Sequence, residues 1–303
     1  MSRIRNIHTF GTSHTEGGGF EFDTHHTLDK VYSGISYPMT QFNFSWPGQL
    51  NHLLTNNIEV HNHAKSGYGN ERVYRKVIDV VTSPNFDIKS DVLLLELSEL
   101  GRKEYYHNDI GDYVINNYMF NNDTHFSFAN TYYKDKYKKE ITDILGRDNQ
   151  LFFDFYKKTI NVDIQIKTLQ QNLIFLINFL NNNNIIWYLV AGAPIFSPAQ
   201  SVYVDYESKL IDYYFPKFDS TGGYTLKHYH DFIDASHENG LCIVHETNEY
   251  FSDEHQGLFA NKIISKTIYN RLCDDGLISN TPLDIDYSEW NDIRDKTRNN
   301  LLV

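Results

Sequence analysis

Short apolar runs recur along this chain and are separated by segments of helical periodicity. Residues 3–10 and Ile58–Ala64 alternate apolar and polar side chains, which predicts two strands. Asp91–Leu97 is a nearly continuous apolar run, typical of a strand covered on both faces and therefore of a parallel sheet. Ile185–Ala191 is a further buried strand by the same criterion, and Leu241–His245 a short last one.

Helical spacing of apolar side chains predicts helices between and after these strands. One begins at Pro47, which suits the first turn of a helix, and the next is capped by Asn70. A third covers residues 164–180, and a fourth follows His255. Residues 140–160 and 228–238 are weaker helical segments. The apolar faces of the four helices are, in order, Leu50, Leu53 and Leu54; Val73, Val77 and Val81; Ile166, Leu169, Leu173, Leu176, Ile177 and Leu180; and Phe259, Ile263, Ile264 and Ile268.

Alternation of strands and helices at this rhythm predicts an α/β fold, with a three-layer arrangement and about five parallel strands. No linker or internal repeat divides the chain, so we expect one domain over residues 1–303, with inserted segments at about 105–160 and 195–235. The first insert, from Tyr105, has no clear period and is interpreted as a loop region or small lid. Gly17-Gly18-Gly19 lacks the G-x-G-x-x-G spacing of a phosphate cradle and is interpreted as a flexible loop.

The composition of the chain indicates which kinds of binding partner to expect. The 303 residues are 41% hydrophobic and 22% charged, as in ordinary globular proteins, and the formal charge of −12 argues against a nucleic-acid partner. The chain has neither a signal-peptide pattern nor an apolar stretch of membrane-spanning length. We therefore expect no membrane partner, and a protein that is cytoplasmic or released by a non-Sec route. Cys242 and Cys273 do not make a disulfide framework.

Residues suited to nucleophilic catalysis follow the predicted strands. This chemistry needs a hydroxyl, an imidazole that takes its proton, a carboxylate that orients the imidazole, and donors for an oxyanion. Because parallel strands share a direction, the residues that follow them gather at one edge of the sheet. The candidates in chain order are Ser13, Gly67, Ser98, Glu99, Asp253 and His255.

Three blocks of this sequence resemble the SGNH (GDSL-like) hydrolase family. Gly11-Thr12-Ser13-His14-Thr15, with Trp46-Pro47 and the segment 62–73, is similar to the first two blocks. Asp253-Glu254-His255, which opens an amphipathic helix, is similar to the last block. The motifs are short, and their order and spacing over residues 5–272 make the match specific.

The resemblance implies a flavodoxin-like sheet and ester hydrolysis through an acyl-enzyme, without a metal or organic cofactor. By position, Ser13 would be the nucleophile and the first oxyanion donor, and Gly67 the second donor. His255 would be the base and Asp253 the carboxylate that orients it. Loops rich in Tyr, Trp and Asn favour a small-molecule or carbohydrate ester as substrate, such as short acyl groups on a sugar.

The chain departs from the family pattern at three places. Thr12 stands where the family often has Asp, and Asp253 precedes the histidine by two residues, not three. Ser98-Glu99 occupies the place of an oxyanion asparagine, and a carboxylate there would oppose the developing charge. Glu99 turns away, or Ser98 or another amide donates instead, or the protein is a weak or inactive carbohydrate-binding or structural module. These alternatives remain open at the level of sequence.

Two histidine patterns raise the question of a metal. His61 and His63 share one face of a predicted strand, but the sequence offers no third ligand beside them. His245-Glu246 opens a pattern that resembles a zinc helix, yet it lacks the second histidine at the fourth position. We therefore expect no metal site.

Overall fold

A computed structural model gives the structure of the chain. It describes residues 4–20, 35–54, 57–66, 69–98, 102–108, 112–117, 162–190, 255 and 257–284. All structural statements below concern these residues.

Four parallel strands form the central sheet. They are β1 (Asn6–Phe10), β2 (Glu59–Asn62), β3 (Asp91–Glu96) and β6 (Ile186–Val190), in the order β2-β1-β3-β6. This order places β1 and β3 side by side, as in the flavodoxin-like arrangement. The predicted α/β class with a parallel sheet is confirmed, and the predicted fifth strand, Leu241–His245, lies outside the described residues.

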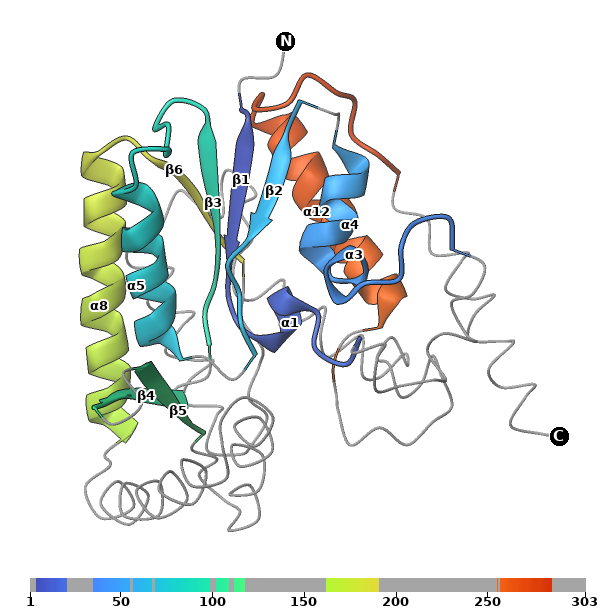
Figure 1. Ribbon diagram of the computed structural model, residues 1–303. Coiled ribbons are helices and arrows are strands. Elements are labelled where there is room, and N and C mark those ends of the chain that lie inside the picture. The colour runs from blue at the N-terminus through green and yellow to red at the C-terminus, as the bar shows by residue number, and fades with distance from the viewer. Residues whose placement is uncertain are drawn as a thin grey trace, which may run out of the picture.

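Helices cover both faces of the sheet, as Figure 1 shows. Helices α5 (Asn70–Val81) and α8 (Val162–Asn182) lie on one side, and α4 (Trp46–Leu53) and α12 (Leu258–Asp274) lie on the other. No helix in the described part of the chain is long and apolar enough to cross a membrane.

Burial follows the hydrophobic pattern of the sequence. All six residues of β3 are buried, which agrees with a strand covered on both faces. On the helices, the predicted apolar faces point into the same core. Its members there include Leu50, Val73, Val77, Leu173, Leu176, Ile177, Leu180, Ile264 and Ile268. Helices α4 and α12 are also joined by a hydrogen bond, because the Ser265 hydroxyl donates to the Trp46 carbonyl at 2.8 Å.

The segment after β1 contains two single-turn helices that were not predicted. They are α1 (Ser13–Glu16) and α3 (Gln41–Phe44), and each is too short to give a periodic signal. Gly17-Gly18-Gly19 forms a turn after α1, and the flexibility expected of this loop stays a prediction. Gly17 ends α1 in the left-handed conformation, with a φ of 97°, and the N–H groups of Gly17 and Gly18 both donate to the Ser13 carbonyl.

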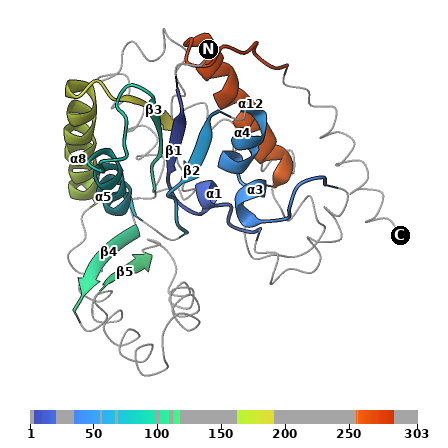
Figure 2. The same cartoon turned by 45° about the horizontal axis from the view of Figure 1, so that its top comes forward.

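An antiparallel hairpin lies beyond the carboxyl end of β3 (Figure 2). Its strands are β4 (Arg102–His107) and β5 (Asp112–Asn117). The insert from Tyr105 was interpreted as a loop region or small lid, and the hairpin corrects that interpretation where its strands enter the insert. The rest of the insert lies outside the described residues.

The role predicted for Asn70 is also wrong. Gly69 is the N-cap of α5, and Asn70 is the first residue of the helix. The buried Asn70 side chain accepts the Ser98 N–H at 2.7 Å and donates to the Ser98 carbonyl at 2.8 Å. It therefore ties the start of α5 to the chain that leaves β3.

Candidate functional site

Ser13 lies where the strand order of the sheet reverses. β1 and β3 are neighbours, and the segments after them lead to helices on opposite faces of the sheet, α4 after β1 and α8 after β3. At such a point, α/β proteins place ligands at the carboxyl ends of the strands. Ser13 follows β1 by three residues and begins α1, which Figure 1 shows at that end of the sheet. Because the first N–H groups of a helix have no acceptor within it, the Ser13 N–H points out of α1.

Gly18 brings Ser13 and His255 together. A Cβ built on Gly18 would lie 2.6 Å from His255 Nε2 and 2.9 Å from Ser13 Cβ. Two atoms at those distances from one point are at most 5.5 Å apart. A Ser13 rotamer with its hydroxyl turned toward the imidazole shortens the distance from Oγ to His255 Nε2. The two atoms then approach the hydrogen-bonding distance that proton transfer needs. The structure therefore brings together the serine and the histidine that the sequence nominates from opposite ends of the chain.

A second imidazole borders this pair. The ring of His14 lies against the ring of His255, with centroids 4.9 Å apart and planes inclined by 43°. His255 itself precedes the Gly257 N-cap of α12 by two residues. Since α12 packs in the core against α4, the helix fixes the point at which His255 reaches α1.

A buried carboxylate lies beneath the turn that carries Ser13. Glu96, the last residue of β3, accepts the Thr12 N–H and the Thr12 hydroxyl, each at 3.1 Å, and also the Thr15 hydroxyl. Glu96 falls within the apolar run Asp91–Leu97, which the sequence predicted as a buried strand. The signal for it was present, because a charged residue inside a run of buried leucines needs hydrogen-bonding partners.

The chain that leaves β2 is held against α1 by Glu16. Its carboxylate contacts Lys65 Nζ at 2.5 Å and accepts the Ser66 N–H at 2.5 Å. Asn62 adds a second tie, since its side-chain amide donates to the Thr15 carbonyl at 2.8 Å. The described chain therefore runs beside α1 as far as residue 66. Gly67, the predicted second oxyanion donor, lies outside the described residues.

Ser98 follows β3 at the same edge of the sheet and is buried, with 1% of its surface exposed. Its N–H donates to Asn70 Oδ1, so any donation by Ser98 to an oxyanion would come from the hydroxyl. Glu99 and Asp253 lie outside the described residues. Their roles remain predictions from the sequence.

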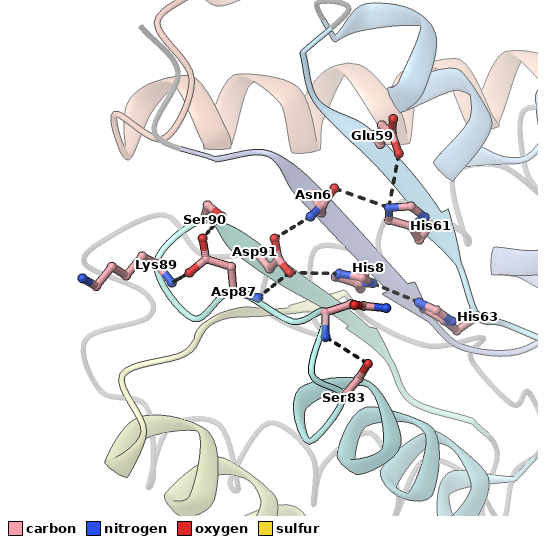
Figure 3. Close-up of polar contacts among 11 residues, drawn as sticks. Asn6, His8, Glu59, His61, His63, Ser83, Asp87, Lys89, Ser90 and Asp91 are labelled. Atoms are coloured by element: carbon pink, nitrogen blue, oxygen red, sulfur yellow. Dashed lines mark hydrogen bonds and ion pairs between the residues drawn. The ribbon is translucent and has the colours of Figure 1, made fainter.

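Three histidines gather on one face of the sheet, as Figure 3 shows. His8 Nδ1 lies 3.0 Å from His63 Nε2, and the rings of His8 and His61 stack with centroids 5.0 Å apart. His8 Nε2 lies 3.5 Å from a carboxylate oxygen of the buried Asp91. β1 pairs with β2 in a register that places His8 opposite His61. The sequence alone did not reveal His8 as the neighbour of His61 and His63.

Two histidines of this cluster, His8 and His63, have lowered pKa values. Burial is the largest cause that lowers the pKa of His63 to about 4, and the nearby His8, His61 and Lys76 contribute to the same shift. Burial also lowers the pKa of His8, against the opposing effect of Asp91. No group of three or more histidine, cysteine or carboxylate side chains among the described residues is arranged to hold a metal ion. The shared face of His61 and His63 is confirmed, and stacking accounts for their arrangement.

Comparison with known proteins gives matches at the level of structure. No family model matches the chain, and no curated protein sequence matches it. One similar solved structure is a G-D-S-L family protein from Desulfitobacterium hafniense DCB-2, with 12% identity, a TM-score of 0.38, and coverage of 88% of this chain and 99% of that chain. Another is the psychrotrophic esterase EstA from Pseudoalteromonas sp., with 11% identity, a TM-score of 0.38, and coverage of 89% and 97%.

Proposed function

We propose that the chain is a serine hydrolase that cleaves carboxylic esters, with Ser13 as nucleophile and His255 as base. The observation that carries the proposal is the contact of both residues with Gly18, which limits the distance between Ser13 Cβ and His255 Nε2 to 5.5 Å. The same edge of the sheet is where parallel α/β folds place their sites.

In the proposed reaction, His255 Nε2 takes the Ser13 hydroxyl proton while Oγ attacks the ester carbonyl carbon. The Ser13 N–H, at the open start of α1, donates to the oxyanion, and Gly67 and the Ser98 hydroxyl are the further donors. His255 then gives the proton to the leaving alcohol, which leaves an acyl group on Ser13. A water molecule attacks that group, its proton passes to His255, and the free acid departs as Oγ recovers the proton.

The orienting carboxylate in this proposal is Asp253, carried over from the family resemblance. The proposed substrate is a short acyl group on a carbohydrate, supported by the Tyr, Trp and Asn content of the predicted loops. The rival proposal is a non-catalytic carbohydrate-binding or structural module. Its support is the sequence Ser98-Glu99 at the place of the oxyanion asparagine.

A fluorophosphonate probe and p-nitrophenyl acetate test the proposal. The wild type should be labelled and should hydrolyse the ester, and Ser13→Ala should abolish both. His255→Ala should abolish turnover, and the double variant should be scarcely worse than either single one, because the two act as a unit. Ser265→Ala is the matched control: this serine is also buried, but its hydroxyl donates to the Trp46 and Asn261 carbonyls.

Two outcomes would reject the proposal. One is labelling that survives in Ser13→Ala and disappears in Ser265→Ala. The other is a folded wild type that is neither labelled nor active at any pH between about 6 and 9, the range in which histidine serves as a general base. The second outcome favours the non-catalytic module.

A further inference from the structure

The carboxylate of Glu96 is fully buried and is surrounded by donors from the Ser13 turn. Transfer of a carboxylate out of water costs several kcal/mol unless hydrogen bonds replace its hydration. Here Oε2 accepts the Thr12 N–H at 3.1 Å and the Thr15 hydroxyl, and Oε1 accepts the Thr12 hydroxyl at 3.1 Å. These donors come from the residues immediately before Ser13 and two positions after it.

Gly11 completes the enclosure. A Cβ at this position would lie 2.5 Å from Thr15 Oγ1 and 2.7 Å from Glu96 Cβ, closer than real Cβ contacts come. The backbone of the turn therefore rests directly on the Glu96 side chain, and this close approach requires glycine. The turn from β1 into α1 is thus folded around Glu96 on both sides of Ser13.

We propose that Glu96 is a positioning residue for Ser13. Its carboxyl group fixes Thr12 and Thr15 through hydrogen bonds, and so sets the direction in which Ser13 presents its hydroxyl to His255. This inference rests on the proposed function. Catalytic groups must be held to within a fraction of an ångström, and a misplacement of 1 Å can cost about 100-fold in rate.

This role explains the departure at Thr12. The family that the sequence resembles often has Asp at that position, where the chain has a threonine. In the structure, the carboxylate comes from the neighbouring strand and accepts a hydrogen bond from the Thr12 hydroxyl. The turn before Ser13 therefore takes its carboxyl group from Glu96 of β3.

Substitution of Glu96 by glutamine distinguishes the effect of its hydrogen bonds from the effect of a negative charge. The Thr12 N–H can only donate, so it requires an acceptor at the place of Oε2, which the amide oxygen of Glu96→Gln supplies. The Thr12 hydroxyl can reverse its role and accept from the amide nitrogen. Glu96→Gln thus keeps the hydrogen bonds to Thr12 and removes the charge, whereas Glu96→Ala removes both.

The first measurement is turnover of p-nitrophenyl acetate. Glu96→Ala should lower kcat by about 100-fold with little change in KM, because positioning affects the transition state more than ground-state binding. Glu96→Gln should stay within about tenfold of the wild type, since it keeps the hydrogen bonds. Thr12→Val should lose part of kcat and Thr12→Ser should restore it, which keeps the test valid if Glu96→Ala fails to fold.

Asp91→Ala is the matched control for burial. Asp91 stands at the other end of β3, is also fully buried, and accepts hydrogen bonds from the Asn6 side chain and the Asp87 N–H. Its loss should lower the free energy of unfolding without lowering kcat in the folded protein. An equal loss of kcat in Asp91→Ala would show that stability alone explains the Glu96 variants, and would overturn the proposal.

The second measurement does not depend on activity. Hydrogen–deuterium exchange should accelerate over residues 11–17 in Glu96→Ala, and in Asp91→Ala that segment should keep its protection. Unchanged exchange there in Glu96→Ala overturns the positioning role, as does an equal loss of kcat in Glu96→Gln and Glu96→Ala. If the wild type is neither labelled nor active, the proposed hydrolase function fails, while faster local exchange still supports Glu96 as the residue that positions the turn.

Discussion

Lowering the pH should lower the free energy of unfolding because histidines of the cluster become protonated. We expect His63 to account for most of this loss. Burial lowers the pKa of His63 from 6.5 to about 4 in the folded chain. Between these two values the unfolded chain binds a proton that the folded chain does not. The free energy of unfolding should therefore fall as the pH is lowered from about 6.5 to about 4, and the contribution of His63 should level off below that.

The size of the effect follows from the shift. A full shift from 6.5 to about 4 corresponds to roughly 3 kcal/mol at 1.36 kcal/mol per pH unit. His63 is only partly buried, so solvent screens the interaction, and we expect about 1–2 kcal/mol. His8 titrates in the same direction, because burial lowers its pKa too, although Asp91 at 3.5 Å opposes this.

Urea unfolding at a series of pH values measures this loss. The wild type should lose stability over the acid range, and His63→Gln should remove much of the slope because glutamine does not titrate. His61→Gln is the matched control, because His61 lies two residues before His63 on the same face of the sheet but its side chain is 42% exposed. An identical pH dependence in the wild type and His63→Gln would refute the reasoning.

Two further predictions concern single contacts. Gly18→Ala should lower turnover about 100-fold, because the new Cβ would lie 2.6 Å from His255 Nε2 and 2.9 Å from Ser13 Cβ and must displace one of them; an esterase assay at wild-type rate would contradict this. Asn70→Ala should lower the free energy of unfolding by about 2–4 kcal/mol, because it leaves the buried N–H and carbonyl of Ser98 without the Asn70 side chain. Urea denaturation measures this loss, and Asn183→Ala, at an exposed hydrogen bond, should cost less than about 1 kcal/mol.

The elements of the fold could be predicted because each has a strong hydrophobic pattern. The run Asp91–Leu97 is apolar on both faces and forms the buried strand β3, and residues 164–180 keep a helical stripe that becomes α8. The position of Ser13 at a strand end also followed from local pattern. Strand order did not, because periodicity does not say which strands pair.

The details of the site needed tertiary structure. Asn70 has the chemistry of a helix cap, but the end of β3 lies close enough for its side chain to bond with Ser98 instead. Glu96 looks like an interruption of a buried strand until the Thr12 turn is folded over it. Gly18 looks like part of a glycine-rich loop until Ser13 and His255 meet beside it. Each of these contacts joins residues that are distant in sequence, so a local pattern could not predict it.

Because Ser13 and His255 meet at Gly18, the pair can form only after the C-terminal part of the chain has been made and has folded. Strands β1, β2 and β3 all lie within the first 96 residues, so the part of the sheet that carries Ser13 can begin to pair early in synthesis. His255 is made much later and reaches Gly18 only when α12 docks on α4, a contact of high sequence separation that must close a long loop. A nascent or C-terminally truncated chain would therefore hold Ser13 without the proposed base, so we expect the proposed esterase activity to appear only once α12 has folded.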